Sequence, residues 1–465
     1  MKILILSISA IFFVFVQQAA AVTLVVDNST DNGSLSACTA AANDCSLRGA
    51  IAAAAVSGDR IQFDANVFDS HPVIGLSGSE LIVNKNIQIG TGFESSQIDI
   101  SANGLSRVFN VPAGFSVGLV NLAIRDGFHP QTAGGIYSEG NLTILSCIIR
   151  NNIGGLAGGV QSSVSGSLIV TASTVTENIS TLPHSGAGIY KSNVFGRIEQ
   201  STISGNRALA GPNSAGGIFA VGVATFLIGD TITNNSAVGE SSAGGVIAND
   251  FSVNLSNCIV AANVNNTTIP DVFPGFGTSG YNLIGNGGAA LGLKYAGTSD
   301  RVGSPSTPID PMLDDLAMHG GKTPTHAILL FGPEVDQGKN QNAFQDQRGL
   351  TQPVDILKIS NAPDGDGCDI GAYELQWPLA DTASLSGRIM DGGTRGVSGV
   401  VLTLSDDQGN SFYAISNPFG YYRFRSIPTS VRYQLHPASK RFLFPAKLVT
   451  VNEDLIDYDL LPISN

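Results

Sequence analysis

Ala133-Gly134-Gly135-Ile136-Tyr137 is the first of five similar segments that decide the fold of this chain. The other four are Ala157-Gly158-Gly159-Val160, Gly186-Ala187-Gly188-Ile189-Tyr190, Ala215-Gly216-Gly217-Ile218-Phe219 and Ala243-Gly244-Gly245-Val246-Ile247. The last glycine of each copy stands at 135, 159, 188, 217 and 245, so it advances by 24, 29, 29 and 28 residues. A period of roughly 20 to 50 residues is typical of a stacked-repeat architecture.

A second motif, which ends in asparagine, follows each glycine pair. Its first copy reads Cys147-Ile148-Ile149-Arg150-Asn151, and its fifth, Cys258-Ile259-Val260-Ala261-Ala262-Asn263, carries one extra residue. An asparagine that recurs once per coil can form an internal ladder in which each amide donates to the next. Alternatively, these residues only adopt the left-handed turn conformation that asparagine tolerates. The predicted ladder residues are Asn151, Asn178, Asn206, Asn235 and Asn263.

Short segments that alternate polar and apolar residues lie between these motifs. Examples are Asn141-Leu142-Thr143-Ile144-Leu145-Ser146 and Ser167-Leu168-Ile169-Val170-Thr171. Such alternation, with many Val, Ile and Thr residues, is typical of strands, and the 55 glycines disfavour helix. A repeat of roughly 28 residues with two or three strands predicts an all-β fold, a parallel β-helix whose coils lie about 4.8 Å apart.

The first 21 residues have the composition of a secretory signal. Lys2 gives a positive start, an apolar run covers 3–16, and Ala19-Ala20-Ala21 suits a cleavage site. The alternative is a membrane anchor, for which the run is short, and no later segment could span a bilayer. We therefore expect a signal peptide over 1–21 and an exported bacterial protein, secreted or on the cell surface.

Charged residues make up only 13% of the chain, and the net charge is −13. Because the sequence shows no basic stripe, nucleic acid is not an expected partner. An anionic polymer would have to be met by local arginine or lysine residues, and these are scattered along the chain.

The five cysteines fall into three groups. Cys38 and Cys45 are close together in a polar loop, and an exported protein is in an oxidising compartment, so we predict a disulfide between them. Cys147 and Cys258 share one repeat position four coils apart, about 19 Å, whereas bonded cysteines need Cα atoms within about 7 Å. We expect both to be buried free thiols. Cys368 has no explanation from the sequence.

Two further motifs flank the repeats. Cys45-Ser46-Leu47-Arg48-Gly49-Ala50-Ile51 resembles the CSLREA motif of exported β-helix proteins. His319-Gly320-Gly321-Lys322-Thr323-Pro324, Asp346-Gln347-Arg348-Gly349 and Asp369-Ile370-Gly371-Ala372-Tyr373-Glu374 resemble the end of choice-of-anchor Q proteins. The resemblance implies a right-handed parallel β-helix, a pectin-lyase-like solenoid, over 22–376. It also implies an N-terminal cap at about 45–57, a closing segment at about 310–374, and a surface or secreted protein without an established activity.

Residues 383–465 differ in character and follow a short linker at 377–382. Ser384-Leu385-Ser386-Gly387-Arg388-Ile389, Gly399-Val400-Val401-Leu402-Thr403-Leu404 and Phe419-Gly420-Tyr421-Tyr422-Arg423-Phe424 alternate polar and apolar residues between turns, which predicts a small β-sandwich. The stretch resembles the carboxypeptidase regulatory-like domain of transthyretin-like fold. That resemblance implies a non-catalytic module.

Acidic residues in the repeats are the candidate catalytic groups, since sugar hydrolysis needs two carboxylates that face one groove. They occupy different phases of the repeat, so we expect no catalytic, cofactor-binding or metal-binding residues. Asp314-Asp315 with His319 belongs to the closing segment, and Asp364-Gly365-Asp366-Gly367 lacks the glutamate of a calcium loop and predicts a turn. The acids are Asp126, Glu139, Glu177, Glu199, Asp230, Glu240 and Asp250.

These features favour a non-catalytic exported protein that binds a polysaccharide or a cell-surface glycan, or acts as an adhesin. The expected contacts are loops that differ in length between coils, at 125–140, 152–158, 179–188, 207–217 and 236–245. One alternative is a polysaccharide lyase or glycoside hydrolase of the pectin-lyase-like fold. A further alternative is a structural spacer whose sandwich is the binding part. The sequence leaves the oligomeric state open.

Overall fold

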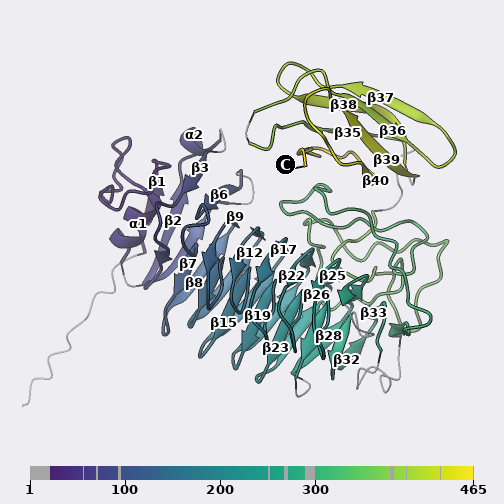
Figure 1. Ribbon diagram of the computed structural model, residues 1–465, viewed down its shortest axis with the longest axis horizontal. Helices are drawn as coiled ribbons and strands as arrows, with labels where there is room; N and C mark the ends of the chain where they lie inside the picture. Colours follow the sequence, from purple (N-terminus) through teal and green to yellow (C-terminus); the bar gives the residue numbers. More distant parts are fainter. Residues whose placement is uncertain are drawn as a thin grey trace, which may run out of the picture.

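The computed structural model is a nearly all-β chain in which a parallel β-solenoid precedes a C-terminal antiparallel region (Figure 1). The all-β parallel β-helix prediction is confirmed. The predicted signal peptide up to residue 20, and 377–381 of the predicted linker, lie outside the described residues. The structure describes 21–55, 57–69, 72–92, 96–249, 252–265, 271–288, 299–376, 382–393, 395–429 and 431–463.

Four parallel sheets, numbered 1 to 4 here, form the solenoid. Sheet 1 contains β1 (Thr23–Val26), β2 (Ser57–Phe63), β5 (Asn86–Gly90), β8 (Ser116–Val120), β12 (Asn141–Leu145), β16 (Ser167–Thr171), β20 (Phe195–Glu199), β24 (Thr225–Ile228), β28 (Val253–Ser256) and β32 (Gly277–Gly280). Sheet 2 contains β10 (Phe128–His129), β14 (Ile153–Gly154), β18 (Ile179–Ser180), β22 (Arg207–Ala208), β26 (Ser236–Ala237) and β30 (Val264–Asn265). Sheet 3 contains β4 (Leu81–Ile82), β7 (Phe109–Val111), β11 (Ile136–Ser138), β15 (Val160–Ser163), β19 (Ile189–Ser192), β23 (Ile218–Val221), β27 (Val246–Ala248) and β31 (Val272–Pro274). Sheet 4 contains β3 (Val73–Gly75), β6 (Ile98–Ser101), β9 (Leu122–Arg125), β13 (Ile148–Arg150), β17 (Thr174–Thr176), β21 (Thr202–Ser204), β25 (Thr231–Thr233), β29 (Ile259–Ala261), β33 (Leu283–Ile284) and β34 (Arg301–Val302).

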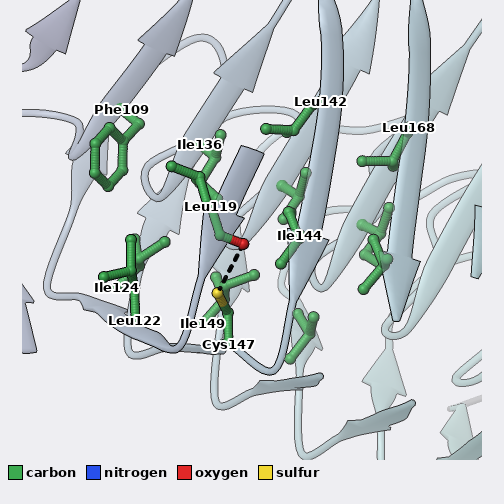
Figure 2. Close-up of a cluster of buried hydrophobic side chains, with 14 of the residues drawn as sticks. Phe109, Leu119, Leu122, Ile124, Ile136, Leu142, Ile144, Cys147, Ile149 and Leu168 are labelled. Atoms are coloured by element: carbon green, nitrogen blue, oxygen red, sulfur yellow. Dashed lines mark hydrogen bonds between the residues drawn. The ribbon is translucent and has the colours of Figure 1, made fainter. Parts of the chain in front are cut away.

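Each repeat contributes one strand to sheets 1, 4, 2 and 3 in that order, and apolar side chains stack inside the coils. Ile149 pairs in register with Val175, which pairs with Ile203 on the next coil. Figure 2 shows this interior, where Leu142 and Ile144 of β12 face the core. Burying one such side chain stabilises the fold by about 1.5–3 kcal/mol. The stack therefore explains why alternate positions of each strand are aliphatic.

An N-terminal cap covers the first coil. Its helix α1 (Leu47–Ala53) begins after Ser46, whose hydroxyl accepts a hydrogen bond from the Gly49 amide, and a second short helix, α2 (Ala65–Phe68), follows β2. Cys38 and Cys45 form the predicted disulfide immediately before α1. Leu47, Ala50 and Ile51 of α1 are buried in the same hydrophobic cluster as the coils, so this helix packs against the core.

The asparagine row lies inside the corner that follows sheet 4. Asn152, not Asn151, is its first member, so the prediction of Asn151 in the ladder is wrong by one residue. Each Nδ2 donates to the Oδ1 of the next member: Asn152 to Asn178 at 2.9 Å, Asn178 to Asn206 at 2.9 Å, Asn206 to Asn235 at 2.9 Å, Asn235 to Asn263 at 3.0 Å, and Asn263 to Asp271 at 2.9 Å.

The residue before each row member adopts the left-handed conformation. Their φ angles are 56° at Asn151, 55° at Glu177, 70° at Gly205, 56° at Asn234 and 57° at Ala262. Both alternatives considered for the asparagine motif therefore occur at this corner. One residue adopts the left-handed turn conformation, and the next residue contributes the buried amide of the row.

The second glycine of each pair makes room for this row. A Cβ atom on Gly217 would lie 2.6 Å from the Gly245 carbonyl oxygen and 3.3 Å from Asn235 Nδ2. On Gly159 it would lie 3.2 Å from Asn178 Nδ2. Contacts this short leave no space for a side chain. The glycine and asparagine motifs recur together because their residues contact each other in every coil.

Cys147 and Cys258 are buried free thiols, as predicted. They occupy a second corner row in which the Cys147 amide donates to Ser173 Oγ at 3.1 Å and the Cys258 amide donates to Asn282 Oδ1 at 2.9 Å. Burial raises the pKa of Cys147 to about 12, so this thiol stays protonated. The same row contains the fully buried Asp230, whose pKa burial raises well above its usual value.

The C-terminal region has a core of its own, separate from that of the solenoid. Leu385, Leu402, Tyr433 and Val449 are buried within it. Its two antiparallel sheets are β35 (Thr382–Arg388) with β38 (Tyr421–Pro428), and β37 (Ser411–Ile415), β36 (Val401–Ser405), β39 (Val431–Ala438) and β40 (Lys447–Val451) in that order.

Candidate binding surfaces

Residues 310–374, the closing segment, lie against the outer face of sheet 4. Gln347 Nε2 donates to Thr174 Oγ1 at 2.9 Å, and Thr202 Oγ1 donates to Gln347 Oε1 at 2.6 Å. The Ala372 amide donates to Thr231 Oγ1 at 3.0 Å. The threonines stand on β17, β21 and β25, so this part of sheet 4 is an internal contact surface and is not available to a ligand.

Arg348 connects the closing segment to the C-terminal region. Its side chain is fully buried, with Nη2 2.7 Å from Asp346 Oδ2 and Nη1 2.5 Å from Glu453 Oε1. The guanidinium carbon lies 3.6 Å from the centre of the Tyr373 ring. His319 packs edge-on against the same ring, and burial lowers its pKa to about 3. A neutral, buried His319 supports the expectation that it is structural.

Asp314 and Asp315 bind the C-terminal region as well. Asp314 Oδ1 lies 3.0 Å from Arg432 Nε, and its other oxygen accepts the Thr450 amide. The Leu448 amide donates to Asp315 Oδ2 at 3.0 Å. Both carboxylates are thus engaged in contacts with the C-terminal region.

Buried carboxylates in the closing segment make its stability depend on pH. Glu374 Oε2 accepts the Asp369 amide at 3.0 Å, and burial raises the pKa of both carboxyls; it also raises that of Asp336 to about 6. A raised folded-state pKa contributes stability that is complete below the unfolded value and is lost as pH rises through the folded value. The thermal transition of the closing segment, followed by calorimetry, should therefore fall between pH 5 and pH 9. Asp369→Asn with Glu374→Gln should flatten this dependence, and an unchanged slope would contradict the assignment.

The loops predicted to make contacts border sheet 2, and several of their apolar side chains are exposed. Phe128 is 43% exposed and Leu209 is 53% exposed. Ile153 and Val238 are exposed as well. Phe128 pairs in register with Ile153 on the next coil. This face, the sheet 2 face, is the surface that the sequence predicted.

Two exposed phenylalanines lie side by side on the outer face of sheet 1, which the sequence analysis did not single out. Phe195 is 39% exposed and Phe226 is 36% exposed, and their ring centres are 6.1 Å apart. Arg197 pairs in register with Phe226 and forms an ion pair with Glu199, with 2.6 Å between Nη2 and Oε2. Ile198 between them is buried, so strand alternation directs Phe195, Arg197 and Glu199 outward. The Phe–Arg face, as it is called below, consists of Phe195, Phe226, Arg197 and Glu199.

A chain of polar contacts surrounds Tyr137 on sheet 3. Tyr137 OH donates to Glu139 Oε1 at 2.9 Å, and the Arg107 guanidinium carbon lies 4.9 Å from the ring centre. Arg107 Nη1 lies 2.9 Å from Glu80 Oε2, and its Nε donates to a backbone carbonyl. The carboxylates of Glu80 and Glu139 beside Arg107 are groups that a lyase or hydrolase could use. However, burial raises the pKa of Tyr137, which opposes the use of Tyr137 as a base. The contacts favour a structural role.

The other acids considered from the sequence are dispersed. Asp126 pairs with Arg125, and Asp250 lies outside the described residues. Asp366 accepts the Asn340 amide at 3.1 Å and the Cys368 amide at 3.3 Å, as in the predicted turn. Within the described ranges, no three His, Cys, Asp or Glu side chains are arranged to hold a metal ion.

No protein-family model matches the chain, and no curated protein matches it. Among the described residues, no helix is both long and apolar enough to cross a membrane.

Proposed function

We propose that this protein is an exported, non-catalytic polysaccharide-binding or adhesive protein whose contact surface is the Phe–Arg face. The exposed pair of Phe195 and Phe226 beside Arg197 and Glu199 carries the proposal. Aromatic rings pack against the apolar face of a sugar ring, while charged side chains exchange hydrogen bonds with its hydroxyls. The face thus offers both kinds of contact within neighbouring coils.

The surroundings of the Phe–Arg face add to this argument. Ser167, which pairs in register with Phe195, donates its hydroxyl hydrogen bond to Asn141 Oδ1 at 3.1 Å, so polar groups continue along the sheet. Coils about 4.8 Å apart repeat along one axis, which suits an extended polymer. The resemblance to choice-of-anchor Q proteins also implies a surface or secreted protein, and the resemblance to carboxypeptidase regulatory-like domains implies a non-catalytic C-terminal module.

The test is binding of the full chain to a panel of neutral and acidic polysaccharides, measured by affinity electrophoresis. Phe195→Ala with Phe226→Ala should weaken binding about tenfold or more, because two stacking contacts are lost. Phe128→Ala on the sheet 2 face is the matched control and should leave affinity unchanged.

Three other outcomes would reject this assignment. If Phe128→Ala lost as much affinity for the polysaccharide as Phe195→Ala with Phe226→Ala, the contact would lie on the loops predicted from the sequence. Binding that depends only on the C-terminal region would favour the spacer alternative. Turnover of a polysaccharide, with release of reducing ends or unsaturated products, would favour the lyase or hydrolase alternative and direct attention to Glu80 and Glu139.

A further inference from the structure

Three arginines gather on the outer face of the two-stranded sheet β35–β38. Along β38, Tyr422 and Phe424 are buried, whereas Tyr421, Arg423 and Arg425 are exposed. This alternation places Arg423 and Arg425 on the same face, about 7 Å apart. Arg388 of β35 pairs in register with Tyr421 and extends the same face.

Among the residues that the structure describes, Arg423 and Arg425 have no carboxylate at ion-pair distance, whereas Arg388 lies near Asp459, whose Oδ1 accepts its backbone amide at 2.7 Å. Within the described residues, none of the three forms an ion pair, although the chain carries 37 acidic residues. Arg423 Nη2 donates to Ser384 Oγ at 3.1 Å. Arg388 Nε donates to the Phe419 carbonyl at 2.9 Å, and its guanidinium carbon lies 5.3 Å from the Tyr421 ring centre. Each guanidinium has five donors, so most remain available to a ligand.

A shallow depression of about 350 Å³ lies beside Arg423. Ser386, Asn417 and Tyr421 line it with hydroxyl and amide groups, and Asp457 supplies a carboxylate. Tyr421 is 54% exposed. The depression therefore combines donors for an anion, an acceptor for hydroxyl groups and an aromatic ring.

We propose that this face, the arginine face, binds an acidic polysaccharide whose carboxylates pair with Arg423 and Arg425 while its hydroxyls contact the depression. Guanidinium groups recognise carboxylates through paired hydrogen bonds. A nucleic acid offers fewer hydroxyls than a polysaccharide to the Asp457 carboxylate, so the lining of the depression favours a polysaccharide. This site lies in the C-terminal region and is independent of the Phe–Arg face.

The experiment uses the full chain, with polygalacturonate as the probe and its methyl-esterified form as the uncharged counterpart. Polygalacturonate should bind at least tenfold more tightly than its methyl-esterified form. Raising the salt concentration from about 0.05 M to 0.5 M should weaken the binding of polygalacturonate. Arg423→Ala with Arg425→Ala should reduce its affinity tenfold or more, while Arg423→Lys with Arg425→Lys should retain part of it. Arg207→Ala, an exposed arginine on β22, is the matched control and should bind as the parent does.

Each contrary result overturns the proposal. Equal affinity for both polymers, unchanged binding in Arg423→Ala with Arg425→Ala, or stronger binding to single-stranded DNA would each do so. An unchanged thermal transition in the alanine variant separates loss of the site from loss of the fold. The same titration in Phe195→Ala with Phe226→Ala distinguishes the two surfaces, since binding at the arginine face should persist there even if the Phe–Arg face binds nothing.

Discussion

Asn206→Leu is expected to reduce the free energy of unfolding of the solenoid by about 3–5 kcal/mol. Asn206 Oδ1 accepts hydrogen bonds from the Asn178 amide at 3.0 Å and from Asn178 Nδ2 at 2.9 Å. Its Nδ2 donates to the Val175 carbonyl at 2.9 Å and to Asn235 Oδ1 at 2.9 Å. Leucine has a similar volume but leaves the Asn178 amide without its acceptor and removes one bond each from Asn178 Nδ2 and Asn235 Oδ1. Each unsatisfied buried group costs about 1–3 kcal/mol.

The measurement is native-state hydrogen exchange of the full chain, together with its denaturant midpoint. Amides of β17, β21 and β25 should lose protection in Asn206→Leu, because the row connects neighbouring coils. Asn151→Gly is the matched control, since Asn151 lies outside the row and its φ of 56° suits glycine. Equal destabilisation by the two substitutions would mean that the row does not hold the coils together.

The error at Asn151 shows what the sequence pattern could and could not establish. The second copy of the asparagine motif, Thr174-Val175-Thr176-Glu177-Asn178, puts Cys147 opposite Thr174 if the two copies are compared residue by residue, but the structure pairs Ile148 with Thr174. Ile259 likewise pairs with Thr231, so Cys258 precedes the motif and no residue is inserted there. Two consecutive asparagines at 151 and 152 concealed the shift, because either could be the row member.

The period, the strands and the paired glycine and asparagine motifs were predictable because they depend on contacts between equivalent positions of adjacent coils. The Phe–Arg face could also have been found, since strand alternation alone turns Phe195 and Arg197 outward. The arginine face was harder to predict, because Arg388 lies more than thirty residues before its neighbour Arg423. Docking of Arg432 onto Asp314 joins segments of different type, and no repeat pattern relates them.

Arg348→Met is expected to destabilise the closing segment by about 3–5 kcal/mol, the usual cost of breaking a buried ion pair. The Arg348 and Asp346 side chains are both fully buried, so the substitution leaves the Asp346 carboxylate uncompensated in the interior. Arg348 Nη2 also donates to the Glu374 carbonyl at 2.6 Å, which would keep only the bond from Gln376 Nε2 at 3.1 Å. Asp346→Asn with Arg348→Met should recover part of the loss, because it removes both charges.

The contact with Glu453 extends the effect to the C-terminal region. Because Arg348 Nη1 lies 2.5 Å from Glu453 Oε1, loss of the guanidinium should release the region as well as the closing segment. Limited proteolysis should then cleave within the closing segment, 310–374, earlier than in the parent chain, and amides of β39 and β40 should exchange faster. Arg425→Met removes an exposed arginine and should change neither measurement. Faster cleavage without faster exchange would show that the contacts of Asp314 and Asp315 hold the C-terminal region in place without Arg348, and that Arg348 stabilises the closing segment alone.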